Sequence, residues 1–324
     1  MSWLCGGLRW TAGRPALAWY GGGGRLEHVE RVERVERVER VSALTYGGDV
    51  AFRVAGAERL CVGVRRGGCP LRAVVPRRSS GGQCPECARL ERSRSVAADT
   101  MADDPRPYAV YLAWFGPGLV KVGITADERG STRLLEQGAV AFSWLGRGPL
   151  MAARRAEELL RAALGVPDRI PYKEKRAVRT SLPARAERAR EIEELHRRAG
   201  ALVGWPESLE RAPFEAVDHA GVFGLEGLRP MTGVVTELVP GGVVAGRLVA
   251  AAGPDLHLGT ADGGVVVLDT RLMSGWELAG ARGAARGAAQ GLAGGAAGGA
   301  AQGVTVGVTV PVKSVERGVQ GGLF

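Results

Sequence analysis

Four cysteines are the first residues whose type and spacing could do chemistry, and they fall within 27 positions: Cys61, Cys69, Cys84 and Cys87. The last two form a CPEC motif. In such a CxxC turn the backbone curls around the sulfurs, and two pairs of thiolates complete a tetrahedral zinc site. Four thiolates leave no position for water, so the expected zinc ion is structural. The alternative is that Cys61 is a core strand residue and the others are free thiols.

A second group of chemically useful side chains lies on the stretch YAVYLAWFGPGLVKVGITADERGSTRLLEQG. Ala109–Phe115 and Leu119–Ile124 are apolar runs that predict two strands, and Gly116-Pro117-Gly118 predicts a tight turn between them. Tyr111 lies on the first strand and Lys121 on the second. Because neighbouring antiparallel strands present side chains to a common face, we expect the phenol and the ammonium to share one face of the sheet.

A helix is expected to follow these strands. Thr125 and Asp127 are good N-cap residues, and Gly138 is a good helix terminator. The helix would carry Arg129 and Arg133, with Arg133 about two turns in. Its guanidinium groups would then lie near the surface of the sheet.

These residues resemble a known signature. Ala109-Val110-Tyr111 and Lys121-Val122-Gly123, followed by Arg133, are similar to the two-strand motif of the GIY-YIG nuclease superfamily. The runs KVGIT and TRLLEQGA, preceded by a cysteine cluster, resemble still more closely the domain-of-unknown-function 2797 family. The resemblance covers the middle half of the chain.

The resemblance to the nucleases implies a set of roles. Tyr111 would lie near the attacking water, and Arg133 would contact the scissile phosphate, with Arg129 as the competing candidate. Glu157, in the later helix AARRAEELL, would bind one divalent metal ion such as Mg²⁺. The implied chemistry is in-line displacement at phosphorus, with cations stabilising the developing charge.

The sequence also departs from that signature. Lys121 stands where the second tyrosine would be, there is no histidine between Tyr108 and Pro183, and the chain has no asparagine. A lysine at this position could hold a phosphate as a point charge. Two functions therefore stay open: a metal-dependent nuclease centre, or a non-catalytic structural or regulatory protein that binds an anionic ligand or partner.

The charge balance points to an anionic partner. The net charge is +9, and residues 147–198 hold 14 Lys/Arg against 8 Asp/Glu. We therefore predict nucleic-acid contacts from the basic segment Arg169–Arg179 and from Arg129 on the helix expected after the two strands. The expected contact residues are Arg129, Lys173, Lys175, Arg176 and Arg179. The competing explanation is a coding bias, because the chain has 50 glycines and no asparagine.

The sequence gives an expectation for the compartment. MSWLCGGLRW lacks a charged start and a continuous apolar run, and no later stretch is long enough to span a membrane. Five cysteines without an export signal favour a reducing cytoplasm over a disulfide framework.

The predicted fold class is α+β. A small GIY-YIG-like core of sheet and helices is expected at 108–204, between an N-terminal β region with the cysteine site at 1–87 and a C-terminal small antiparallel barrel at 205–324. Residues 88–107 are interpreted as a linker. The triplet repeat at 29–41 and the Gly/Ala-rich run at 280–303 are interpreted as insertions.

Overall fold

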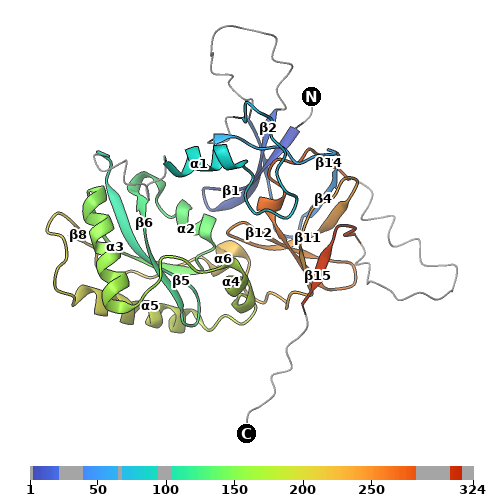
Figure 1. The fold of residues 1–324 in the computed structure, drawn as a ribbon. Coiled ribbons are helices and arrows are strands. Elements are labelled where there is room, and N and C mark those ends of the chain that lie inside the picture. Colours follow the sequence, from blue (N-terminus) through green and yellow to red (C-terminus); the bar gives the residue numbers. More distant parts are fainter. Residues whose placement is uncertain (1–2, 22–38, 65–67, 94–103, 282–306, 316–324) are drawn as a thin grey trace. The chain divides into compact units, whose positions relative to one another are not determined.

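The computed structural model describes residues 3–21, 39–64, 68–93, 104–281 and 307–315, which form a mixed α+β protein with several sheets (Figure 1). The chain divides into two compact units. The central unit comprises residues 10–14 and 89–228, and the discontinuous unit comprises residues 1–9, 15–88 and 229–324. The discontinuous unit is thus assembled from segments that precede and segments that follow residues 89–228 in the sequence.

The sheet of the central unit has the order β6-β5-β7-β8, and β9 also pairs with β7. All these pairings are antiparallel. All nine residues of β5 are buried, so both faces of this strand are covered. The strands are β5 (Tyr108–Gly116), β6 (Leu119–Ala126), β7 (Ala141–Gly148), β8 (Glu210–Arg211) and β9 (Val217–Asp218).

Helices pack on this sheet. The contacts of α3 are with β5, β6 and β7, and those of α5 are with β5 and β7. Gly165 ends α3 in the left-handed conformation, as the sequence predicts for a glycine after a helix. The helices of the unit are α2 (Thr132–Gln137), α3 (Leu150–Leu164), α4 (Tyr172–Val178), α5 (Arg185–Gly200) and α6 (Ala220–Phe223).

The helix predicted to begin at Thr125 begins later. Strand β6 continues through Ala126, and Asp127–Arg129 form a separate 3₁₀ turn, η3. Gly130 then adopts a positive φ of 45°, so η3 and α2 do not form one continuous helix. Arg133 therefore lies in the first turn of α2 and not two turns into a longer helix.

The discontinuous unit contains a seven-stranded sheet with the order β14-β4-β11-β12-β13-β10-β15. Within the described ranges this sheet is open, so the small C-terminal barrel is not confirmed. The sequence predicts a barrel from C-terminal strands alone, whereas in the structure β4 pairs with β11, which lies almost two hundred residues further along the chain. The strands are β4 (Asp49–Val54), β10 (Gly233–Val235), β11 (Val243–Ala252), β12 (Asp255–Gly259), β13 (Val265–Asp269), β14 (Leu278–Gly280) and β15 (Val312–Ser314).

A three-stranded sheet and a short helix complete the N-terminal part. The sheet comprises β1 (Trp3–Thr11), β2 (Arg14–Gly21) and β3 (Glu39–Ala43), and α1 spans Pro85–Ser93. In the run 60–64, Leu60 and Gly63 form isolated bridges, with Val74 and Gly68. The short 3₁₀ helix η4 (Thr270–Leu272) follows β13.

Most of the two predicted insertions, 29–41 and 280–303, lies outside the described residues. Of the helices that the structure describes, none is both long enough and apolar enough to cross a membrane.

Candidate functional site

The cysteine cluster lies in the discontinuous unit. The sulfur atoms of Cys61, Cys69, Cys84 and Cys87 all lie within 4.8 Å of one another, and all four residues are buried. The Sγ atoms of Cys69 and Cys84 are 4.0 Å apart. In a tetrahedral Zn–S₄ site, bonds of about 2.3 Å place the sulfurs roughly 3.8 Å apart. The cluster is thus close to the geometry of a four-thiolate centre and could hold a metal ion such as zinc.

Short local elements position these sulfurs. Cys84 immediately precedes α1 and Cys87 lies in its first turn. The backbone amide of Cys61 donates to the carbonyl oxygen of Ala73 at 2.8 Å, which ties the first ligand loop to the chain beyond Cys69. Gly63 has a positive φ of 76°, and a Cβ there would collide with the carbonyl of Gly68. The loop therefore needs glycine at this position.

Backbone amides stabilise a thiolate at Cys61. The amide of Cys84 donates to its Sγ at 3.1 Å and that of Gly63 donates at 3.4 Å. Burial raises the pKa of Cys61, and burial together with the neighbouring thiols raises the pKa of Cys87. Without a cation, the thiols of Cys61 and Cys87 thus resist ionisation, whereas a bound metal ion would deprotonate them.

Arg59 fastens the loops around the cluster. Its guanidinium is 1% exposed and donates five hydrogen bonds to carbonyl oxygens, at 2.6–3.2 Å. The acceptors lie in the cysteine-bearing loop and at the end of η4: Pro76, Ser79, Gly81, Arg271 and Ser274. Burial lowers the pKa of Arg59 to about 10, which leaves the side chain charged at neutral pH. A single buried cation thus joins segments more than 200 residues apart in sequence.

The second group lies on the sheet of the central unit. Tyr111 is opposite Gly123, and Ala113 is opposite Lys121, so these four residues share one face of the β5–β6 pair. The Nζ atom of Lys121 lies 5.7 Å from the centroid of the Tyr111 ring. The phenol and the ammonium are therefore neighbours on the same face, where the sequence places them.

Packing fixes the phenol of Tyr111. Its hydroxyl accepts a hydrogen bond of 2.9 Å from the Nε2 atom of Gln137, and its ring meets Trp144 edge to face. A Cβ at position 123 would collide with the hydroxyl of Tyr111, so glycine is what lets the phenol lie across β6. The hydroxyl is thus held in place and buried.

Charged groups gather around Lys121. The ammonium donates a hydrogen bond of 3.2 Å to the carbonyl oxygen of Asp168. Burial, and next the charge of Arg133, lower the pKa of Lys121 to about 8, while the carboxylates of Glu157 and Asp168 oppose this shift. Burial raises the pKa of Glu157, and Lys121 opposes that shift. Tyr111 and Lys121 thus each interact electrostatically with both Arg133 and Glu157, and we call these four residues the Tyr111–Lys121 centre.

The two arginines of this region are exposed and share one carboxylate. Arg129 lies 2.6 Å from Glu136, and Arg133 lies 3.7 Å from the same carboxylate. The shorter contact binds Arg129, which leaves Arg133 as the arginine with an electrostatic effect on both Tyr111 and Lys121. Both side chains are accessible to a ligand.

The donor set does not fit a divalent metal ion well. Within the described part of the chain, the cysteine cluster is the one group of three or more potential metal ligands. The carboxylate of Glu157 already has the ammonium of Lys121 as a nearby cation, and Arg133 adds a second positive charge. A Mg²⁺ ion would have to enter against both charges, whereas an anion would be attracted.

The basic segment is less exposed than the sequence suggests. Lys175 is 4% exposed, its Nζ atom donates to the carbonyl oxygen of Gln137 at 3.1 Å, and it lies 3.7 Å from the centroid of the Phe115 ring. Arg179 is 1% exposed. These two side chains are therefore internal, which corrects their expected place on a nucleic-acid surface. Lys173 is exposed, and Arg176 is half-buried against Tyr172.

Sequence reasoning missed three residues. Arg59 carries no motif, and its five acceptors are scattered along the chain. Asp168 acts on Lys121 through its backbone carbonyl as well as its charge. Gln137 is visible in TRLLEQG as a polar residue just before the helix-ending glycine, and this position was the one available signal.

Comparison with protein families decides the classification. The family model described as a protein of unknown function, DUF2797, matches residues 51–278, which is more than half of the chain. The chain belongs to this family. The match starts in β4 and ends in β14, so it includes both the cysteine cluster and the Tyr111–Lys121 centre. No curated protein and no solved structure matches the chain.

Proposed function

We propose that this member of the DUF2797 family is a zinc-containing nucleic-acid-binding protein, and that the Tyr111–Lys121 centre receives a phosphate group. One observation carries the proposal: a lysine that is only 9% exposed lies against a buried phenol, within electrostatic reach of Arg133. A buried ammonium favours an anionic partner, and the carboxylates of Glu157 and Asp168 only partly offset the effect of burial and of Arg133 on Lys121.

A phosphate would complete this balance. It would accept from the Lys121 ammonium and from the exposed Arg133 guanidinium, which supplies parallel donors that match phosphate oxygens. The Tyr111 hydroxyl, held by Gln137, supplies a further donor. Because an anion stabilises the protonated form of Lys121, binding should be tight below the pKa of about 8 and should weaken as the pH rises above it.

The zinc ion would stabilise the discontinuous unit, which carries the cysteine cluster. Its four thiolates would hold the cysteine-bearing loops together, and binding free energy at such a site is folding free energy. The residues that would hold it are Cys61, Cys69, Cys84 and Cys87. With no open ligand position, the metal supplies structure and not chemistry.

The test measures the binding of labelled single- and double-stranded DNA and RNA by fluorescence anisotropy, at a series of salt concentrations. Affinity should fall steeply with salt, because each phosphate contact releases counterions. Lys121→Met and Arg133→Gln should each weaken binding about tenfold, since hydrogen bonds to charged groups contribute about 1.5–3 kcal/mol. Arg190→Gln, an exposed change of the same charge on α5, is the control and should have a small effect. No binding by the wild-type protein at low salt would refute the proposal.

A second candidate is phosphodiester cleavage at the same centre. It is favoured by the electrostatic contact between Tyr111 and Glu157, a phenol and a carboxylate that the nuclease resemblance also pairs. Incubation of the same nucleic acids with and without Mg²⁺ tests it. Cleavage that is lost in both Tyr111→Phe and Glu157→Gln would establish this activity, and binding without cleavage would leave the first proposal standing alone.

A further inference from the structure

The loop that follows Cys69, residues 70–78, carries an exposed surface with no part in holding the cysteine cluster. Besides two prolines, its exposed side chains are aliphatic or cationic: Leu71, Arg72, Val74, Arg77 and Arg78. Leu71 is 69% exposed and Val74 is 56% exposed. Residues 68–82 contain no Asp or Glu. The 70–78 loop therefore presents apolar and positively charged side chains together to the solvent.

Hydrogen bonds fix the backbone of the 70–78 loop. The amide of Arg72 donates to the carbonyl oxygen of Cys69 at 3.1 Å, and the amide of Val75 donates to that of Arg59 at 2.8 Å. The guanidinium of Arg59 donates to the carbonyl oxygen of Pro76 at 2.8 Å. Because the protein itself sets the shape of the loop, a partner would bind it without a large cost for ordering it.

Arg72 has a backbone conformation that favours glycine. Its φ is 46°, and among the described residues only Ala12 and Arg72 combine a side chain with a positive φ. The Cβ atom costs free energy in this conformation, which glycine would avoid. Strained backbone of this kind gathers at functional sites. The strain at Arg72 is therefore accounted for if its guanidinium has a ligand.

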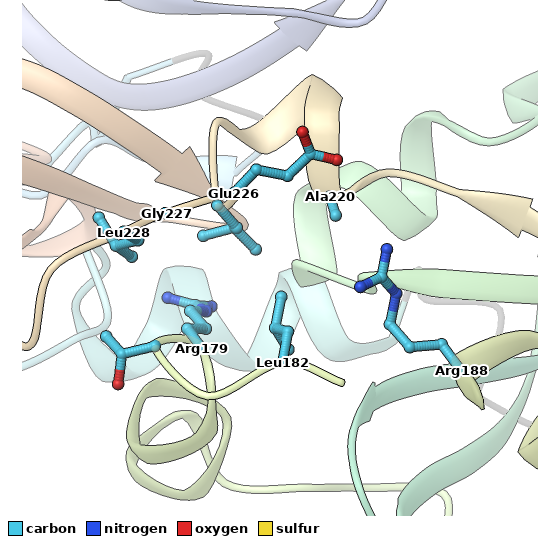
Figure 2. A pocket seen from close by; sticks show the side chains of 9 residues that line it. Arg179, Leu182, Arg188, Ala220, Glu226, Gly227 and Leu228 are labelled. Carbon is cyan, nitrogen blue, oxygen red and sulfur yellow. The ribbon is translucent and has the colours of Figure 1, made fainter. Parts of the chain in front are cut away.

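Other arginines of the chain have a carboxylate of their own. Arg188 is 6% exposed, and its Nε and Nη2 atoms donate to Asp218 at 2.8 and 2.7 Å. Figure 2 shows Arg188 at a pocket of the central unit. In the 70–78 loop, Arg78 lies 3.0 Å from the carboxylate of Glu237. The charges of these two arginines are thus balanced inside the protein.

Arg72 and Arg77 differ from these two. Within the part of the chain that the structure describes, neither forms an ion pair with a carboxylate. The guanidinium of Arg77 lies over the ring of Trp276, 6.0 Å from its centroid, which positions the group without neutralising it. Two exposed positive charges of the 70–78 loop are therefore available to an anionic partner.

We propose that the 70–78 loop is a second contact surface for nucleic acid, where Arg72 and Arg77 bind phosphate oxygens and Leu71 and Val74 contact sugar and base faces. A guanidinium offers parallel N–H donors that match phosphate oxygens. Nucleic-acid-binding proteins also place aliphatic side chains against base steps beside basic residues. The inference rests on the nucleic-acid binding proposed above, but not on the Tyr111–Lys121 centre.

A lipid surface fits these side chains less well. Even a single myristoyl chain gives only marginal membrane binding, and Leu71 and Val74 together bury less apolar surface than such a chain. A phosphate backbone needs no deep insertion, because its charges and its sugar faces lie at the surface of the polymer.

The test is fluorescence anisotropy of the full-length protein with a labelled short DNA strand and with the duplex of the same sequence, at a series of salt concentrations. Arg72→Gln should weaken binding about threefold or more at low salt, and should lower the slope of log affinity against log salt by about 0.7 for the strand or about 0.9 for the duplex, as for one lost phosphate contact. Arg53→Gln, an exposed change of the same charge on β4, is the control and should alter neither quantity. Wild-type affinity and slope in Arg72→Gln would overturn the proposal.

Two further variants separate charge, apolar contact and strain. Leu71→Ser removes no charge, so it should weaken binding and leave the salt slope unchanged. Arg72→Gly should melt at the same or a higher temperature than the wild type, because glycine accepts a positive φ, and should bind as weakly as Arg72→Gln. Wild-type affinity in Arg72→Gly would show that the guanidinium has no ligand and would overturn the proposal.

Lys121→Met distinguishes this surface from the Tyr111–Lys121 centre. Weaker binding in Arg72→Gln with wild-type affinity in Lys121→Met would support the loop and refute the centre, and the reverse result would overturn the loop alone. Sedimentation with phosphatidylserine vesicles tests the lipid alternative. Vesicle binding that is lost in Leu71→Ser, while the DNA affinity of this variant stays at the wild-type value, would assign the loop to a lipid surface and overturn the proposal.

Discussion

The cysteine cluster and the Tyr111–Lys121 centre are both groups of reactive side chains with a buried part, but they are assembled in opposite ways. The cysteines come from 27 consecutive positions and are brought together by tight loops. Tyr111, Lys121, Arg133 and Glu157 come from two strands and two helices and need strand register to meet. The first group is uniform and closed, whereas the second mixes charges and retains an exposed arginine. This difference matches the two roles proposed above: structure for the first site and ligand binding for the second.

The largest expected effect, and the strongest test of this comparison, comes from removing one sulfur atom of the cysteine cluster. Cys84→Ser should lose the metal ion and several kcal/mol of stability, because the binding free energy of structural zinc, about 10–16 kcal/mol in small peptides, is folding free energy. Metal analysis by mass spectrometry should find about one zinc per wild-type chain and much less in the variant. Cys5→Ser, a buried cysteine outside the cluster, is the control and should retain the metal. A zinc-free wild-type protein would disprove the structural-zinc assignment.

The next largest effect is expected at Arg59, which joins the loops around the cysteine cluster. Arg59→Met leaves five carbonyl oxygens without their donor and should cost about 3–5 kcal/mol, as for other broken charge networks. Urea denaturation measures it, with Arg53→Met, an exposed change on β4, as the control. A cost below about 1 kcal/mol would show that the loops hold without Arg59.

Lys121→Met should increase the free energy of unfolding, whereas the two substitutions above decrease it. Burial lowers the pKa of Lys121 from 10.5 to about 8, so the charged lysine destabilises the fold at neutral pH. At about 1.4 kcal/mol per pKa unit, and with Glu157 losing a nearby cation, the variant should gain about 1–3 kcal/mol. Destabilisation by this substitution would show that Lys121 is a structural cation like Arg59.

The gain has a defined pH dependence. Between pH 8 and 10.5 the unfolded wild-type chain binds more protons at Lys121 than the folded one, so wild-type stability rises with pH in this window. The advantage of Lys121→Met should therefore be full below pH 8 and should shrink as the pH approaches 10.5. Chemical denaturation at pH 7 and pH 9.5 measures this difference, and a constant gap would contradict the assigned pKa.

The smallest effect concerns the phenol. Tyr111→Phe loses the 2.9 Å hydrogen bond from Gln137 and should cost about 1 kcal/mol without altering the sheet. Tyr172→Phe is the control, because its hydroxyl donates a longer hydrogen bond, of 3.4 Å, to the carbonyl oxygen of Glu136. Equal melting temperatures for the two variants would mean that the Gln137 bond contributes little.

The same contrast explains what could be predicted from the sequence. The cysteines could be read directly, since their ligand role depends on type and local spacing. The strands around Tyr111 and Lys121 were also readable, because a glycine turn separates two short apolar runs. The start of α2 could not be predicted in this way, because β6 continues through Thr125 and the positive φ of Gly130 separates η3 from α2.

Exposure was harder to predict than position. The basic run around Lys175 suggests a charged surface, yet Lys175 packs over Phe115 and Arg179 lines a cavity. Long basic side chains carry both a charge and an aliphatic stem, so sequence alone does not reveal which part a fold uses. The open seven-stranded sheet was missed for another reason: its β4–β11 pairing joins strands almost two hundred residues apart.

The reach of Arg59 also has a consequence for the order in which the protein is made. Its acceptors at Arg271 and Ser274 lie 212 and 215 residues further along the chain. A ribosome that adds about 5–20 residues per second needs roughly 10–40 s to reach them. All four cysteines are therefore synthesised well before the fastening at η4 can form. During this interval the nascent thiols are exposed to metal ions and to oxidants, so whichever reaches them first acts on the chain before Arg59 has closed the loops.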